Sequence, residues 1–170
     1  MENTFGRDLI PQNEEERLEN LKNYKILYTK SETKFDQLSA LTASMFNTPI
    51  AMINFVDKDQ VWTKSTQGGH DNEEVERGSS LCSLAILKDS VTVFEDALAE
   101  PILLSNPMVA GEFGLRFYAA APIKTSEGFN VGAVCIIDTA SRDFSEEDQG
   151  KLEWIADLIR LEMESRKKIS

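Results

Sequence analysis

Histidine and cysteine are scarce in this sequence: one histidine, His70, and two cysteines, Cys82 and Cys135, stand among 170 residues. So few ligands leave no set for a zinc or haem site, and two cysteines cannot build a disulfide scaffold. No apolar run approaches the roughly 18 residues that a membrane-spanning helix needs. The N-terminus also lacks the apolar core of a signal peptide. We therefore expect no metal and a cytoplasmic protein whose cysteines stay reduced.

The sequence also has fewer basic than acidic residues. The chain has 18 Lys and Arg against 29 Asp and Glu, which gives a net charge of −11. Nucleic-acid phosphates and anionic membrane surfaces would repel such a protein at long range, so we expect neither as a partner. Hydrophobic residues make up 41% and charged residues 28%, the composition of an ordinary folded protein long enough to bury a core.

The chain divides into helical ends and a central region rich in strands. We expect a flexible tail, N-terminal helices, a sheet-and-pocket core and a C-terminal helix at about 1–12, 13–46, 47–140 and 145–168. The last three form a single domain, 13–170. The first helix is predicted to begin at Asn13, with Glu16 placed as in a capping box. A second is predicted over 31–46 from its 3–4 spacing of apolar residues.

Strand patterns fill the core region. Strands are predicted at 50–56, 61–66, 91–94, 116–124 and 131–138. A polar loop (67–77) and a short helix (81–87) lie between the second and third strands. Short connections favour antiparallel pairing, so the pattern predicts an α+β fold with the terminal helices on one face of the sheet. The long irregular stretch 95–115 is then expected to cover a ligand pocket on the other face.

The last helix carries two apolar stripes. One stripe is expected to pack on the sheet. Trp154, Leu158 and Leu161 form the second, on roughly the opposite side at 100° per residue. A helix lying on one sheet needs a single stripe, so these three residues are candidates for contact with another helix. That helix belongs either to the same chain or to a second copy in a homodimer.

Several segments together resemble the GAF domain family. TPIAMINFVDKDQVWTKSTQG, SSLCSLAIL, VFEDALAEP, SNPMV, RFYAAAPIKTSEGFNVGAVCIIDT and RDFSEEDQGKLEWIADLI follow one another in the family's order, over about 35–159. The resemblance implies a profilin/PAS-like central antiparallel sheet with a pocket for a small molecule. It also implies a role in signal transduction and dimerisation through the terminal helices. No output domain follows in this sequence, so we expect a separate signalling partner.

Polar residues at strand ends and beside the short helix are the candidates for ligand contacts. The set is Asn54, Ser80, Cys82, Asp96, Arg116, Tyr118 and Asp138. Asn54 is a polar residue inside an apolar strand and needs a partner, either backbone or ligand. Arg116 and Tyr118 alternate along a strand and would share a face. Each of the seven also has an ordinary structural role open to it, as a cap, turn former or packing residue.

Catalysis has little support in the sequence. No nucleophile elbow, phosphate loop or Cys/His/Asp arrangement is present, so we expect no enzyme activity. Cys82 is followed by serine rather than histidine, which argues against a covalent bilin. The leading prediction is a sensory domain that binds a small molecule of unknown identity. The alternatives are a ligand-free dimerisation or scaffold module, and a thiol-based reductase or redox switch that uses Cys82.

Overall fold

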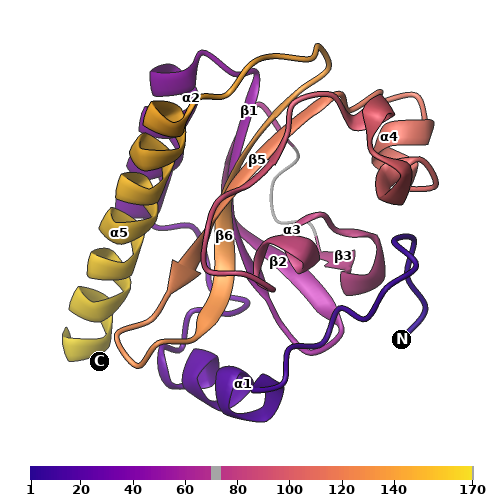
Figure 1. The fold of residues 1–170 in the computed structure, drawn as a ribbon. Coiled ribbons are helices and arrows are strands. Elements are labelled where there is room, and N and C mark those ends of the chain that lie inside the picture. Colours follow the sequence, from indigo (N-terminus) through magenta and orange to yellow (C-terminus); the bar gives the residue numbers. More distant parts are fainter. Residues whose placement is uncertain (70–73, 170) are drawn as a thin grey trace.

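The computed structural model describes residues 1–69 and 74–169 and shows one antiparallel sheet between two unequal layers (Figure 1). The strands, in the spatial order β3-β2-β1-β6-β5-β4, are Glu74–Glu76, Gln60–Gln67, Ile50–Val56, Asn130–Asp138, Phe117–Lys124 and Thr92–Phe94. All neighbouring strands pair antiparallel, which confirms the predicted α+β class. The edge strand β3 was not predicted and lies within the polar loop expected at 67–77. Its three residues, Glu-Val-Glu, are too few and too polar to show a strand pattern.

Long helices cover one face of the sheet. The helices are α1 (Glu14–Asn23), α2 (Thr33–Phe46), α3 (Cys82–Ala85), α4 (Pro107–Ala110) and α5 (Glu146–Ile169), with 3₁₀ turns η1 (Arg77–Ser79), η2 (Ala97–Ala99) and η3 (Pro101–Leu103). Helices α2 and α5 lie together on one face, α3 and α4 lie on the other, and α1 lies at one end of the sheet (Figure 1). None of the helices in the described ranges combines the length and the apolar run needed to cross a membrane.

The strands divide their side chains between two cores with a period of two. Along β1, Ala51, Ile53 and Phe55 point to the core under α2 and α5. Met52 and Val56 belong to the second core, under α3 and α4. Successive side chains of a strand point to opposite faces, so a largely apolar strand such as IAMINFV supplies both cores.

The start of α5 follows the sequence prediction closely. Ser145 Oγ accepts a hydrogen bond from Asp148 N at 3.1 Å, and Asp148 Oδ2 accepts one from Ser145 N at 3.0 Å. This reciprocal pair is a capping box, and it fixes where the helix begins. At α1, by contrast, Asn13 makes no side-chain cap, so the capping box predicted there with Glu16 is wrong.

The N-terminal segment is not the flexible tail that the sequence predicts. Phe5 is 5% exposed and Leu9 is 1% exposed, and both belong to the core under α3 and α4. Thr4 N donates to Gly78 O at 2.9 Å, which ties the segment to η1. The two apolar side chains are separated by charged residues and lack any periodicity, so their burial leaves no pattern in the sequence.

Candidate functional site

A cavity of about 310 Å³ lies in the face covered by α3 and α4. Its walls are mostly apolar. They are formed by Met52, Val61 and Ile137 from the sheet, Leu115 from the loop before β5, and Leu81 beside α3. Pockets of this kind, apolar with a few polar groups, are the usual form of small-molecule sites. The polar side chains among the described lining residues are Asn54, Thr63, Ser79, Ser80, Cys82, Tyr118 and Cys135. Among the described lining residues none carries a charged side chain.

Strand register brings three of these polar groups to one place. Cys135 of β6 pairs with Met52 of β1 and Ala120 of β5, and Asn54 pairs with Ala133. Tyr118 pairs with Ile137, two residues from Cys135. Asn54, Tyr118 and Cys135 therefore lie on the same face of three adjacent strands, within the reach of long side chains on neighbouring positions.

Asn54 is the centre of the resulting hydrogen-bond network. Its Nδ2 lies 3.3 Å from Cys82 Sγ and 3.9 Å from Cys135 Sγ, and its Oδ1 accepts from Thr63 Oγ1 at 2.8 Å. Tyr118 Oη lies 3.1 Å from Cys82 Sγ. A buried amide needs partners for both ends, and here they are a hydroxyl and two sulfur atoms.

The two thiols differ in their readiness to ionise. Hydrogen bonding from Cys135 lowers the pKa of Cys82 to about 7 against the opposing effect of burial, with help from Asn54, Tyr118 and Ser80. The same contact with Cys82, together with burial, raises the pKa of Cys135 well above its usual value. Burial and the nearby thiols likewise raise the pKa of Tyr118. Cys82 is thus the group that becomes an anion, and its neighbours are the donors that stabilise it.

The mouth of the cavity is formed by partly exposed apolar side chains. Met108 and Phe113, from α4 and the loop after it, are 37% and 39% exposed, and Val75 of β3 is 39% exposed. Gly68 closes another side. It has φ +75°, and a Cβ there would lie 1.9 Å from the Pro49 carbonyl oxygen, so only glycine fits.

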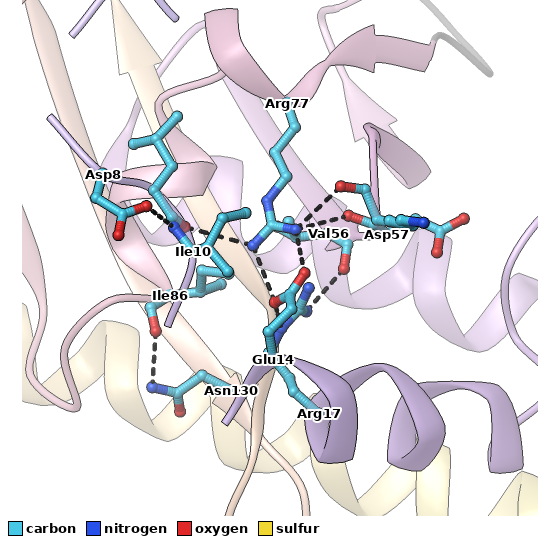
Figure 2. Close-up of polar contacts among 11 residues, drawn as sticks. Asp8, Ile10, Glu14, Arg17, Val56, Asp57, Arg77, Ile86 and Asn130 are labelled. Carbon is cyan, nitrogen blue, oxygen red and sulfur yellow. Dashed lines mark hydrogen bonds and ion pairs between the residues drawn. The ribbon is translucent and has the colours of Figure 1, made fainter. Parts of the chain in front are cut away.

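A buried ionic group holds the segment that leads into α3, and we call Glu14, Arg17 and Arg77 the arginine cluster (Figure 2). Glu14 accepts from Arg17 Nε at 2.8 Å and from Arg77 Nη2 at 3.1 Å. Arg17 Nη1 donates to Val56 O at 2.7 Å, and Arg77 Nη1 donates to Asp57 O at 3.3 Å. The Arg77 carbonyl in turn accepts from Ser83 Oγ at 2.5 Å. The cluster therefore connects α1 and the end of β1 to the helix that carries Cys82.

Four of the seven predicted ligand contacts line the cavity: Asn54, Ser80, Cys82 and Tyr118. Cys135 and Thr63, which the sequence does not single out, lie beside them. The alternation of β1, β5 and β6 is the signal that could have identified Cys135. Once the three strands are paired in order, its parity matches that of Asn54 and Tyr118.

Arg116, Asp96 and Asp138 do not line the cavity. Arg116 Nη1 donates to the Val109 and Leu115 carbonyls and so holds the loop after α4. Asp96 is exposed and caps η2 by accepting from Leu98 N at 3.1 Å. Asp138 forms an ion pair with Arg142, which outweighs burial and lowers the Asp138 pKa. Each of the three has a structural partner in the described part of the chain, and of the three Asp96 has the capping role that was its alternative.

The candidates on α5 divide between surface and core. Trp154 is 50% exposed and Leu161 is 53% exposed, whereas Leu158 is half-buried against the core under α2 and α5. The loop histidine, His70, lies outside the described residues. Within residues 1–69 and 74–169 no group of three or more His, Cys, Asp or Glu side chains is placed to hold a metal ion.

This architecture, a six-stranded sheet with long helices on one face and a loop-covered cavity on the other, is that of a GAF domain. The GAF domain family matches residues 31–163, and the chain belongs to that family, as the sequence predicts. GAF domains are a signalling and sensory family. A curated relative from Pseudomonas aeruginosa, the cyclic di-GMP phosphodiesterase PA2567, is 35% identical over 150 residues, which are 88% of this chain and 25% of that protein. The chain thus spans about a quarter of that relative's length.

Solved structures with this fold include both sensors and enzymes. The free methionine-R-sulfoxide reductase from Neisseria meningitidis has a TM-score of 0.67 at 17% identity, over 88% of this chain and 89% of that one. The GAF domain of a phosphoenolpyruvate-protein phosphotransferase from Coxiella burnetii has a TM-score of 0.65 at 16% identity, over 90% and 94%. The expectation of no enzyme activity is contradicted by the phosphodiesterase and reductase relatives. It was wrong to exclude catalysis because known sequence motifs are missing.

Proposed function

We propose that this GAF domain is a sensor whose cavity binds a small, uncharged and largely apolar molecule. The observation that carries the proposal is the cavity itself, about 310 Å³ in volume, with apolar walls and a floor of hydrogen-bonding groups. The walls would supply affinity, and Asn54, Thr63 and Tyr118 would orient one polar end of the ligand. Such a division between apolar walls and a few polar contacts is general for small-molecule sites.

Charge argues for the class of ligand. An anionic ligand would need cationic groups or several free backbone donors at the floor of the cavity. Cyclic di-GMP, which appears in the name of the Pseudomonas aeruginosa relative, is such a ligand. The described lining residues offer neither lysine nor arginine, and Arg116 is held by backbone carbonyls outside the cavity. The net charge of −11 adds long-range repulsion. An uncharged ligand meets neither obstacle.

Occupancy would reach the helical face through Glu95 and Phe144. Glu95 follows β4 and begins the long segment over the cavity, and its Oε2 accepts from Phe144 N at 2.6 Å. Phe144 immediately precedes the capping box of α5 and packs against Phe46, the last residue of α2, with ring centroids 5.5 Å apart. A ligand that binds one arrangement of the covering segment more tightly would therefore shift the packing of both helices.

Binding of a neutral fluorophore tests the proposal. N-phenyl-1-naphthylamine is apolar and uncharged, and we expect it to bind the purified protein with micromolar affinity. Met52→Trp would fill the cavity and weaken binding at least about tenfold. Met45→Trp places the same residue on the exposed side of α2 and should leave binding unchanged. Equal binding by both variants would place the fluorophore elsewhere and overturn the proposal.

Native mass spectrometry of the freshly purified protein complements this titration. A non-covalent mass that is lost on denaturation would identify a natural ligand. We expect that mass to belong to an uncharged molecule. A bound nucleotide or other polyanion would contradict the ligand class proposed here.

We also propose that α5 forms a homodimer contact through Trp154 and Leu161. Both side chains are about half exposed on one long helix, and a two-fold pairing would bury each against its own copy. Sedimentation velocity of Trp154→Glu/Leu161→Glu tests this, with a shift to monomer expected. Leu98→Glu, at an equally exposed leucine on η2, is the matched control and should sediment as the unmodified chain. A chain that is monomeric without substitution would overturn the dimer.

A further inference from the structure

The floor of the cavity places two thiols together where nothing in the proposed reversible binding needs them. Cys82 comes from α3 and Cys135 from the middle of β6, and Asn54 Nδ2 contacts both sulfur atoms. The two sulfur atoms thus share one hydrogen-bond donor, the Asn54 amide. Packing alone does not account for this arrangement, because Cys82, although part of an apolar core, also has the polar partners Asn54 and Tyr118.

Both thiols are shielded from bulk solvent. Cys82 is 2% exposed and Cys135 is 1% exposed, and both line the cavity. A reagent therefore reaches them through the cavity, past Met108 and Phe113 at its mouth. An apolar reagent gains from contact with the walls, whereas a small polar one loses hydration without replacement.

We infer that the cavity is a reaction site for apolar organic hydroperoxides, with Cys82 as the attacking thiol and Cys135 as the thiol that resolves it into a disulfide. The inference uses the cavity of the proposed function but does not depend on a reversible ligand.

The chemistry balances with the groups present. The Cys82 thiolate attacks the terminal oxygen of the hydroperoxide, so that an S–O bond forms and the O–O bond breaks. The departing alkoxide takes a proton from the Tyr118 hydroxyl, which faces Cys82, and leaves as an alcohol. Tyr118 regains from solvent the proton that Cys82 released when it ionised, and Cys135 still holds its own. The Cys135 sulfur then attacks the Cys82 sulfenic acid, and the hydroxyl leaves with the remaining thiol proton as water. Overall, two thiols and one hydroperoxide give one disulfide, one alcohol and one water.

The division of roles follows from the surroundings of each sulfur. Cys82 receives hydrogen bonds from several donors, which stabilise its thiolate, the reactive form of cysteine. Cys135 lies in the middle of a strand between β1 and β5 and keeps its proton. The ionised Cys82 is therefore suited to react first with the hydroperoxide. The protonated Cys135 is suited to react second, with the Cys82 sulfenic acid.

Peptide mapping by mass spectrometry after brief oxidation tests the inference. Cumene hydroperoxide is expected to produce an internal Cys82–Cys135 disulfide, and to do so about tenfold faster than hydrogen peroxide at equal concentration. The unfolded protein is the control and should lose this preference. A disulfide that dithiothreitol removes completes the cycle. Equal rates for the two peroxides in the folded protein would overturn the assignment of an apolar oxidant.

Single cysteine variants test the roles. Cys135→Ser should accumulate a sulfenic acid at Cys82 that dimedone traps, and Cys82→Ser should leave Cys135 as a free thiol. Trapping at Cys135 in the second variant would overturn the roles, and no oxidation of either cysteine in the unmodified, folded chain would overturn the site. Loss of fluorophore binding with retained disulfide formation would refute only the proposed function. Fluorophore binding without disulfide formation would refute only this inference.

Discussion

The two faces of the sheet bury similar apolar side chains but are covered by different structures. Helices α2 and α5 lie along one face, and Phe35, Ile155 and Ile159 fill the space beneath them with no exposed surface. The other face is covered by helices of four residues, 3₁₀ turns and the N-terminal segment. Long helices present continuous ridges that interlock with a sheet, whereas short turns leave gaps. The difference explains why the cavity of about 310 Å³ lies under the short elements.

The polar groups of the candidate site lie on one of these two faces. Asn54, Tyr118 and the two thiols lie under the short elements, and the arginine cluster at the end of β1 holds the helix that carries Cys82. The helix-covered face serves as the rigid support. The loop-covered face combines a fixed polar floor with a partly exposed apolar rim. We therefore expect substitutions on the helix-covered face to change mainly stability, and those at the cavity to change mainly binding.

The largest effect is expected from Glu14→Gln. The change keeps the shape of the side chain but leaves the guanidinium groups of Arg17 and Arg77 buried without an anion. Removing one member of a buried ionic group costs about 3–5 kcal/mol of unfolding free energy. Urea denaturation measures the loss, and Glu147→Gln at an exposed ion pair on α5 is the control, with a change below about 0.5 kcal/mol. A loss below about 1 kcal/mol would show that the cluster is not a structural anchor.

Truncation on the two faces should have unequal costs. Ile159→Ala, under the long helices, creates a void in a filled core and is expected to cost about 3 kcal/mol. Met108→Ala, at the partly exposed rim of the cavity, should cost less than about 1 kcal/mol. Denaturation curves and fluorophore titrations should therefore distinguish the two variants. The first variant loses stability and keeps binding, and the second keeps stability and weakens binding. Similar costs for both would contradict the comparison.

Acid should weaken the cluster that fastens the loop-covered face. Burial raises the pKa of Glu14, but the hydrogen bonds from Arg77 and Arg17 outweigh it and the net pKa is lowered. A lowered folded-state pKa stabilises the protein above the ordinary value near 4.5, and this contribution disappears as pH falls through the folded pKa. The unfolding free energy of the unmodified chain should therefore fall between about pH 5 and about pH 3. Glu14→Gln should show a shallower fall, and an identical slope would exclude Glu14 as a source.

The smallest effect is expected from Tyr118→Phe. Losing the hydroxyl 3.1 Å from Cys82 Sγ removes one donor to the thiolate, while Asn54, Ser80 and Cys135 remain. The pKa of Cys82 should rise from about 7, and its alkylation by iodoacetamide at pH 7 should slow about two- to fivefold. A pH–rate profile measures the change. Tyr28→Phe, at an exposed tyrosine that bonds Asp57, should leave the profile in place.

Secondary structure follows largely from local pattern. The strand IAMINFV begins and ends at the residues predicted, Ile50 and Val56, because an apolar run between a proline and an Asp-Lys-Asp turn has little freedom. The start of α5 follows from Ser145 and Asp148 in the same way. Placement of Phe5 and Leu9 does not follow, since a segment without period or turn signal is placed only by the surface it covers.

The site was predicted in part for a related reason. Asn54 and Tyr118 could be identified because each is a polar residue within a strand whose alternation fixes its face. The role proposed for the Cys135 thiol does not follow from its strand alone, because it depends on Cys82, 53 positions away in the sequence. Asp96 and Asp138 match the composition of a pocket rim, but local caps and ion pairs use them instead. Partners distant in sequence decide which polar residues are free for a ligand.

The outer strands of the sheet bear on how the protein behaves at high concentration. β3 and β4 have three residues each, whereas the inner strands have seven to nine. β3 carries exposed Glu74 and Glu76 on either side of its single valine. Short edge strands, one of them charged, give another sheet little backbone to pair with, which discourages edge-to-edge aggregation. Solutions concentrated for crystallisation or NMR should therefore stay free of sheet-mediated aggregates, and a variant that lengthens β3 with neutral residues should lose that protection.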